Sequence, residues 1–419
     1  MTIRTRLIHL PLTAFALAML CALTVTSAQA QTYSVLHYFT GGSDGGNPVA
    51  GVTVAGPGIL YGTASSVSSP SHNLGTVFKL TQRGSDWTLN PLHEFAGPPD
   101  GDYPAGIAIG PNGALYGTAG GGVGNDGSGW GTVYEVQPPA AACKTAICYW
   151  NETILHAFTY IPDGADPQSD NVVFDQAGNM YGTTIAGGAS NCGVVWELSP
   201  SAGGWTYSIL YNFANHGGGC APTSGVILDP AGNLYGVTLD GGTGAGTLFQ
   251  LVPYNGGWIE NTVLVFSAST GDNSFGRLFM DAHRNLYGTA SLDGPHNGGT
   301  VFEASPFNGG WRFTLIYSFS VCEPEAGVTL GPDGNLYGVC QLGPNSGNQH
   351  GWVFKMPTDC NQTCTPADLH DFNFTDGADP RGPVAFDANG NLYGTAFAGG
   401  IGDCTRFPDQ CGVVWEITP

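Results

Sequence analysis

The sequence is short of charged residues, and of basic ones above all. Lysine and arginine number 11 against 32 acids, so only 10% of the 419 residues are charged and the formal charge is −21. Such an acidic chain repels phosphate backbones, which argues against nucleic acid and anionic membranes as partners. Divalent cations and basic or neutral ligands remain compatible with this charge.

Motifs that carry well-known chemistry are also missing. The chain has no His-Glu-x-x-His sequence and no P-loop, which removes the simplest signs of a metalloprotease or a nucleotide-binding enzyme. No two cysteines have the Cys-x-x-Cys spacing, which disfavours a zinc-thiolate site. The sequence therefore indicates no catalytic residues and no cofactor, except that calcium is left open below.

Long apolar runs are confined to the N-terminus. Arg4 and Arg6 precede an uncharged stretch, Leu7–Val25, and Ala28-Gln29-Ala30 provides a small-x-small cleavage site. This pattern predicts a signal peptide over residues 1–30, cleaved near Ala30, and a mature chain of residues 31–419 without a membrane span. A membrane anchor would need a basic stop-transfer cluster here, and a lipoprotein signal at Cys21 is disfavoured because the bulky Leu20 precedes it.

The chain is rich in glycine, at 66 residues, and 11% of it is aromatic. This mixture disfavours helices and is typical of short strands joined by tight turns. Removal of the signal peptide leaves ten cysteines, an even number that predicts disulfides in an exported chain.

Three short markers each recur seven times along the sequence. The first is Leu-Tyr-Gly, which starts at Leu60, Leu115, Met180, Leu234, Leu286, Leu336 and Leu392. The second is Gly-x-Val-aromatic or a close variant, which starts at Gly75, Gly131, Gly193, Gly246, Gly299, Gly351 and Gly412. The third is a phenylalanine that ends an apolar run, at Phe39, Phe95, Phe158, Phe213, Phe266, Phe319 and Phe372. Five of these phenylalanines follow a tryptophan by eight residues: Trp87, Trp150, Trp205, Trp258 and Trp311.

Each repeat of roughly 53 residues contains four candidate strands, and repeats of this length with four strands indicate propeller blades. We therefore predict an all-β, seven-bladed β-propeller with four antiparallel strands per blade. The mature chain begins with a lone fourth strand, Ser34–Phe39, and ends with a third strand, Val413–Ile417. These two strands should pair and close the ring, because an open solenoid would need polar caps that the sequence lacks. One surface insertion is expected at Pro138–Ile147.

The cysteines fall near pairs of turns that a propeller brings to the same face. We expect the bonds Cys143–Cys148, Cys192–Cys220, Cys322–Cys340, Cys360–Cys364 and Cys404–Cys411, although sequence alone leaves the connectivity open.

The combination of Leu-Tyr-Gly-Thr, a glycine-rich gap, Gly-Thr-Val-Phe-x-Leu and a final Trp…Phe run resembles the GloVer repeat, of the "choice-of-anchor tandem repeat" family of exported bacterial proteins. The resemblance covers residues 33–417. It implies an extracellular or surface-associated protein without an established activity. Family members carry varied C-terminal anchors, whereas this sequence stops at Pro419, directly after the last repeat, which argues against covalent attachment. The blades also look like kelch blades, by architectural analogy only.

Two recurring polar residues are candidates for chemistry. Histidine occurs in four fourth strands, at His37, His93, His156 and His370, but these strands are about 14 Å further from the axis than the first strands. Histidines of four blades cannot converge there, so we expect packing or surface roles. Asp-Gly-x-x-Pro recurs between blades and starts at Asp44, Asp100, Asp163 and Asp376. These four aspartates are weak candidates for a calcium site, and turn chemistry is the preferred interpretation.

Two functions from different classes fit these observations. The favoured one is a secreted, non-enzymatic binding or scaffold module for an extracellular polysaccharide or protein. The alternative is a secreted carbohydrate-active hydrolase or lyase with paired carboxylates in the central funnel. Its residues would be sought in two irregular loops, His216–Cys220 and Glu323–Glu325. A polar cluster at the axis would favour the enzyme, and small apolar residues there would favour the binding module. The repeated tyrosines are expected to pack between blades rather than to form a sugar-stacking platform.

Overall fold

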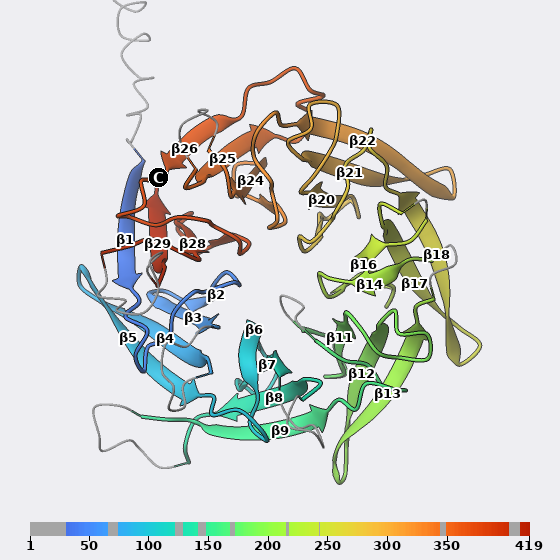
Figure 1. Ribbon diagram of the computed structural model, residues 1–419, viewed down its shortest axis with the longest axis horizontal. Coiled ribbons are helices and arrows are strands. Elements are labelled where there is room, and N and C mark those ends of the chain that lie inside the picture. The colour runs from blue at the N-terminus through green and yellow to red at the C-terminus, as the bar shows by residue number, and fades with distance from the viewer. Residues whose placement is uncertain are drawn as a thin grey trace, which may run out of the picture.

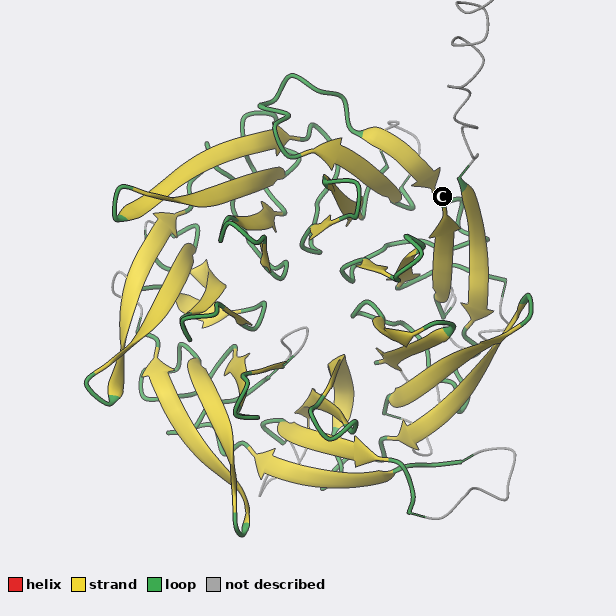
Figure 2. Cartoon of the chain, turned by 180° about the vertical axis from the view of Figure 1, so that it is seen from behind, coloured by secondary structure: helices red, strands yellow, loops and turns green. Residues whose placement is uncertain are grey.

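The computed structural model describes residues 31–65, 74–121, 129–140, 148–167, 172–214, 218–242, 244–343, 349–401 and 411–419. The expected signal peptide, residues 1–30, lies outside this part of the chain. The described residues form strands and loops without a helix, as Figure 2 shows. Consequently, no helix among them could cross a membrane.

The strands form seven small antiparallel sheets in a ring around a central axis, which confirms the predicted seven-bladed propeller (Figure 1). Six blades follow one another in sequence order, and the seventh combines the two ends of the described chain. We number the blades in chain order, and in each the first strand lies nearest the axis.

The first three blades contain twelve strands. Blade 1 consists of β2 (Thr53–Gly56), β3 (Ile59–Ala64), β4 (Thr76–Arg83) and β5 (Asp86–Glu94). Blade 2 consists of β6 (Asp102–Ile109), β7 (Leu115–Gly121), β8 (Thr132–Gln137) and β9 (Asn151–Ala157). Blade 3 consists of β10 (Val173–Phe174), β11 (Met180–Thr184), β12 (Val194–Ser201) and β13 (Gly204–Asn212).

Blade 4 departs from the pattern because its first strand is split into two short pieces that both pair with β16. It consists of β14 (Cys220–Pro222), β15 (Ile227–Leu228), β16 (Leu234–Asp240), β17 (Thr247–Tyr254) and β18 (Gly257–Val265). Blade 5 consists of β19 (Phe279–Met280), β20 (Leu286–Ala290), β21 (Thr300–Phe307) and β22 (Gly310–Ser318). Blade 6 consists of β23 (Thr329–Leu330), β24 (Asn335–Cys340), β25 (Trp352–Pro357) and β26 (Ala367–Asp371).

Blade 7 closes the ring. Its three inner strands come from the end of the chain: β27 (Ala385–Phe386), β28 (Leu392–Ala396) and β29 (Val413–Thr418). Its outer strand is β1 (Thr32–Tyr38), which pairs antiparallel with β29 from Thr32↔Thr418 to Tyr38↔Val413. Figure 1 shows β1 in blue beside β29 in red. The first and last repeats are thereby joined by backbone hydrogen bonds.

The glycine of Leu-Tyr-Gly and the aromatic residue of the next marker face each other across neighbouring strands in every blade. The pairs are Gly62↔Phe78, Gly117↔Tyr134, Gly182↔Trp196, Gly236↔Phe249, Gly288↔Phe302, Gly338↔Phe354 and Gly394↔Trp415. The aromatic ring lies over the glycine, where a Cβ atom would collide with it. This close approach explains why both markers recur together.

The hydrophobic core lies between blades rather than inside them. One cluster, for example, joins Val77 and Phe95 of blade 1 to Ile107, Leu115 and Tyr134 of blade 2. Each blade leaves apolar faces that only its neighbours can cover, so the ring depends on stacking.

Polar contacts also cross the blade interfaces, through the threonine that follows Leu-Tyr-Gly. The Oγ1 atoms of Thr63, Thr289 and Thr395 donate hydrogen bonds to carbonyl groups of the next blade, those of Ala105, Ala326 and Ala50, over 2.7–2.9 Å. Thr395 does so across the closure between blades 7 and 1. In blades 1, 5 and 7 the motif thus contributes to stacking as well as to pairing.

Three disulfides connect described cysteines: Cys192–Cys220, Cys322–Cys340 and Cys360–Cys364. Cys148 and Cys411 are also disulfide-bonded, but their expected partners, Cys143 and Cys404, lie outside the described residues. The expected insertion at Pro138–Ile147 likewise falls mostly outside the described part of the chain.

Deletion of residues 31–40 should lower the melting temperature of the whole ring, because β29 then becomes an unpaired edge. We expect a loss of more than about 5 °C, measured by calorimetry as one cooperative transition. A synthetic peptide of residues 31–40 should restore part of the loss. An unchanged melting temperature after the deletion would contradict closure by β1.

Replacement of Gly236 by alanine should destabilise the fold by about 1–3 kcal/mol, because overpacking forces a well-packed core to move. The new Cβ would lie 2.6 Å from Phe249 Cζ and 2.8 Å from the carbonyl oxygen of Gly225. Gly203→Ala is the matched control, since nothing lies within 4 Å of its Cβ position. Chemical denaturation of both variants provides the measurement, and equal stabilities would disprove the packing argument.

Candidate functional site

The histidines and aspartates that recur in the sequence belong to the same structural unit. In four blades the outer-strand histidine binds, through Nε2, the aspartate of the loop that leads to the next blade. The N···O distances are 3.0 Å for His37–Asp44, 2.9 Å for His93–Asp100, 3.0 Å for His156–Asp163 and 3.3 Å for His370–Asp376. We call each such unit a His–Asp clamp.

In each clamp the aspartate also caps its own loop. Its carboxylate accepts a hydrogen bond from the backbone N–H of Thr40, Ala96, Thr159 or Asn373. Burial opposes ionisation of Asp44, but hydrogen bonds from His37 and Thr40 outweigh it and lower the pKa of this carboxyl. The four aspartates are therefore engaged within their own blades, in the turn role preferred from the sequence.

A residue of the following blade covers three of the clamps, and its identity differs among them. Tyr207 stacks on His156 with ring centroids 3.9 Å apart, and Tyr33 stacks on His370 at 3.5 Å. Against His93 the equivalent position, six residues before the terminal phenylalanine of the repeat, is Glu152. One clamp thus faces a carboxylate instead of an aromatic ring.

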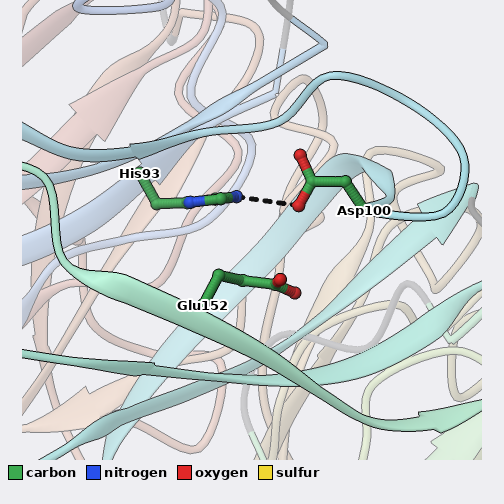
Figure 3. Close-up of side chains that lie close together, drawn as sticks. All are labelled: His93, Asp100 and Glu152. Carbon is green, nitrogen blue, oxygen red and sulfur yellow. Dashed lines mark hydrogen bonds and ion pairs between the residues drawn. The ribbon is translucent and has the colours of Figure 1, made fainter.

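Among the described residues, His93, Asp100 and Glu152 form the one group of three His, Cys, Asp or Glu side chains close enough to hold a metal ion (Figure 3). One ligand-type atom of each residue lies within 4.8 Å of the others. His93 is on β5, Asp100 is in the loop between blades 1 and 2, and Glu152 is on β9. A backbone hydrogen bond of 2.6 Å from Trp150 N to Leu92 O holds the start of β9 against β5 and so brings Glu152 to the clamp.

The carboxyl group of Glu152 is in an unfavourable environment for a charge. Its Oε1 atom is shielded from solvent and has no hydrogen-bond partner. Burial, and secondly the charge of Asp100, raise the pKa of Glu152 to about 7, although His93 acts in the opposite direction. The chain therefore places two carboxylates side by side in a half-buried position.

The repeated tyrosines pack between blades, as the sequence predicts. Their rings contact the tryptophan of the next blade edge to face, with centroids 5.7–6.1 Å apart in Tyr61–Trp150, Tyr116–Trp205, Tyr235–Trp311 and Tyr393–Trp87. Their hydroxyl groups donate to turn aspartates, for example Tyr181 to Asp175 at 3.0 Å and Tyr337 to Asp333 at 2.9 Å. They do not form a sugar-stacking platform in this arrangement.

Blade 7 lacks this tryptophan, because Gln31 stands at its position in the repeat. A cavity of about 270 Å³ lies there, lined by Gln31, Tyr337, Lys355 and Phe386 among others. In blade 6 the equivalent position is Cys364, whose disulfide with Cys360 packs near Tyr287 instead.

The central funnel is a cavity of about 810 Å³. First strands of all seven blades line it with apolar or small residues such as Val52, Ala108, Val173 and Ala385. Arg277 is the only charged residue among the described residues of this lining, which includes no aspartate, glutamate or histidine.

The irregular loops suggested as places for catalysis do not enter the described lining of the funnel. Of the first, only Gly218–Cys220 is described. In the second, burial raises the pKa of Glu325 while nearby Arg381 opposes the shift. Arg381 is itself paired with Asp379 at 2.6 Å.

One catalytic motif was overlooked in the sequence. Residues Gly41–Gly45 read Gly-Gly-Ser-Asp-Gly, which matches the Gly-x-Ser-x-Gly spacing of a nucleophile elbow. In such an elbow the serine sits on a turn between a strand and a helix. Here the segment is the loop after β1 and leads to β2, so the required context is absent from this place in the fold.

Seven sheets stacked around a funnel, with their cores between neighbouring blades, define a β-propeller repeat protein. Residues 128–327 match the family described as the Gloeobacter/Verrucomicrobia repeat. This match confirms the resemblance to the GloVer repeat over residues 128–327. No curated protein sequence matches the chain.

Several solved structures share the fold at low sequence identity. The extracellular domain of a protein assigned as a hybrid two-component system from B. thetaiotaomicron aligns with a TM-score of 0.56 and 12% identity, over 92% of this chain and 39% of that one. A protein assigned as a 6-phosphogluconolactonase from Bacteroides fragilis NCTC 9343 aligns with a TM-score of 0.51 and 14% identity, over 83% and 88% of the two chains. At these identities the likeness concerns the fold alone.

The raised pKa of Glu152 leads to a prediction about the pH dependence of stability. Because the pKa of Glu152 is about 7 in the folded chain and ordinarily 4.5, the unfolded chain loses this proton first as pH rises, and folding stability falls between these two values. Glu152→Gln removes the ionisable group and with it this loss of stability at high pH. In chelator-containing buffer the variant should melt about 2 °C above the wild type at pH 8, and both should melt alike at pH 4. A variant advantage that is the same at both pH values would exclude this explanation.

Proposed function

We propose that this chain is an exported β-propeller that acts as a non-enzymatic binding or scaffold module for an extracellular polysaccharide or protein. The observation that carries the proposal is the composition of the funnel. A cavity of about 810 Å³ is large enough for a ligand, yet Arg277 is the only charged group of its described lining.

Hydrolysis or elimination on a polysaccharide requires positioned acids and bases, most often a pair of carboxylates flanking the scissile bond. The described lining of the funnel offers none. Two acids shortly precede first strands in the chain: Glu325 before β23 and Asp379 before β27. Glu325 is close to Arg381, and Asp379 is paired with it. This arrangement supports binding over turnover in the funnel.

The funnel wall is suited to neutral partners. Uncharged residues such as Val52, Val328 and Phe279 lie in its lining, and polar atoms make up about half of the exposed wall. A neutral glycan end or an apolar loop of a partner protein would match this surface, whereas a polyanion would meet a chain with a formal charge of −21.

Two features support the proposal that the protein is exported. Residues 1–30 have the charge and hydropathy pattern of a signal peptide. The disulfides Cys192–Cys220, Cys322–Cys340 and Cys360–Cys364 are of the kind that persists in oxidising compartments. Together they support an extracellular or periplasmic location.

The proposal is tested by a glycan array with the mature protein and a parallel turnover screen on the same polysaccharides. We expect saturable binding without release of new reducing ends or unsaturated products. Ala385→Trp, which narrows the funnel, should weaken binding at least tenfold, whereas Gly203→Trp on an outer hairpin should not. Turnover that Ala385→Trp abolishes would contradict a binding role and favour a hydrolase or lyase.

A further inference from the structure

We propose that His93, Asp100 and Glu152 bind a divalent transition-metal ion that links blades 1 and 2. The ion would be Zn²⁺ or a neighbouring first-row metal, since imidazole and carboxylate together suit such ions better than calcium, which prefers oxygen ligands alone. This inference is independent of the funnel and of the function proposed for it.

The three side chains lie close to the spacing that a metal requires. One donor atom from each lies within 4.8 Å of the other two, and His93 Nε2 is 2.9 Å from Asp100 Oδ1. Metal–nitrogen and metal–oxygen bonds of about 2.0–2.2 Å place ligand atoms roughly 3–4 Å apart. Figure 3 shows the Glu152 carboxylate beside the Asp100 carboxylate, so a rotation of the Glu152 side chain would bring it nearer to the other two donors.

A second observation also points to a ligand. Glu152 Oε1 is buried without any hydrogen-bond partner, beside a second carboxylate. Buried polar atoms are nearly always partnered, and an exception indicates a bound ion, a water molecule or a functional role. A cation between the two carboxylates removes both their repulsion and the missing contact.

The other blades show that the fold does not need a carboxylate at this position. Tyr207 and Tyr33 occupy it against His156 and His370, and their rings cover the histidines. Glu260 occupies it in blade 4, where the facing residue is Tyr211 rather than histidine, and its Oε1 accepts a hydrogen bond from Thr262. Histidine, aspartate and glutamate meet at only one described interface.

The surroundings hold the ligands in place and leave room for solvent. Asp100 Oδ2 accepts a 2.7 Å hydrogen bond from Ala96 N, which orients the carboxylate. The edge of the His93 ring packs against Phe95, with centroids 4.8 Å apart. The His93 and Asp100 side chains remain 15% and 18% exposed, so water can reach the ion and complete the coordination of three protein ligands.

The experiment uses the mature, untagged protein, stripped with a chelator and titrated with Zn²⁺, Co²⁺ or Ca²⁺. Isothermal titration calorimetry should show one Zn²⁺ per chain, and saturating Zn²⁺ should raise the melting temperature by several degrees, because a ligand that binds only the folded state stabilises it. Co²⁺ should develop visible d–d absorption bands, a signature that a purely structural role of these residues would not produce. Ca²⁺ should bind at least tenfold more weakly.

Two variants remove the site in different ways. Glu152→Gln keeps the size of the side chain, and Glu152→Tyr recreates the stacked arrangement of His156 and Tyr207. Both should fold, bind Zn²⁺ at least tenfold more weakly and lose the Co²⁺ bands. Glu260→Gln, the matched control, should bind like the wild type. Absence of stoichiometric binding to the wild type, or equal binding by Glu152→Gln and the wild type, would overturn the proposal.

Discussion

The stability of this chain depends on the contact between the two ends of the propeller. Every blade has apolar faces that it cannot cover alone, so each blade is stable only between two neighbours. A row of blades would leave two such faces exposed, whereas a closed ring leaves none. The pairing of β1 with β29 makes the ring continuous, and the bond from Thr395 Oγ1 to Ala50 O ties blade 7 to blade 1.

The repeated residues and the individual ones serve different purposes. Leu-Tyr-Gly supplies a core leucine, a tyrosine that contacts the next blade and a glycine that lies under an aromatic ring. In blades 1, 5 and 7 the threonine that follows donates a hydrogen bond across the interface. These positions build the ring and say nothing about a ligand. Three positions depart from the repeat: Glu152 stands against a His–Asp clamp, Gln31 replaces the tryptophan of blade 7, and Arg277 is a charged residue in the funnel lining. Searches for function should therefore begin at these departures.

Much of the fold was predictable because its determinants are local. Three markers, each repeated seven times, predicted the blade number, and the order of strands at the two ends predicted closure. The clamps were missed as units, although His37, His93 and His156 each precede their aspartate by seven residues, a constant spacing that could have revealed them. The meeting of Glu152 with His93 was not predictable from one repeat, since it depends on how β9 stacks against β5. The split first strand of blade 4 also lacked a sequence signal.

Native-state hydrogen exchange followed by mass spectrometry tests the closed ring most directly. If closure maintains the ring, amides of residues 33–38 and 413–418 should exchange as slowly as those of the central strands in blades 2 to 5, with the free energy of global unfolding. Rapid exchange of residues 33–38, while the other blades stay protected, would show that β1 frays independently and that the ring does not need it.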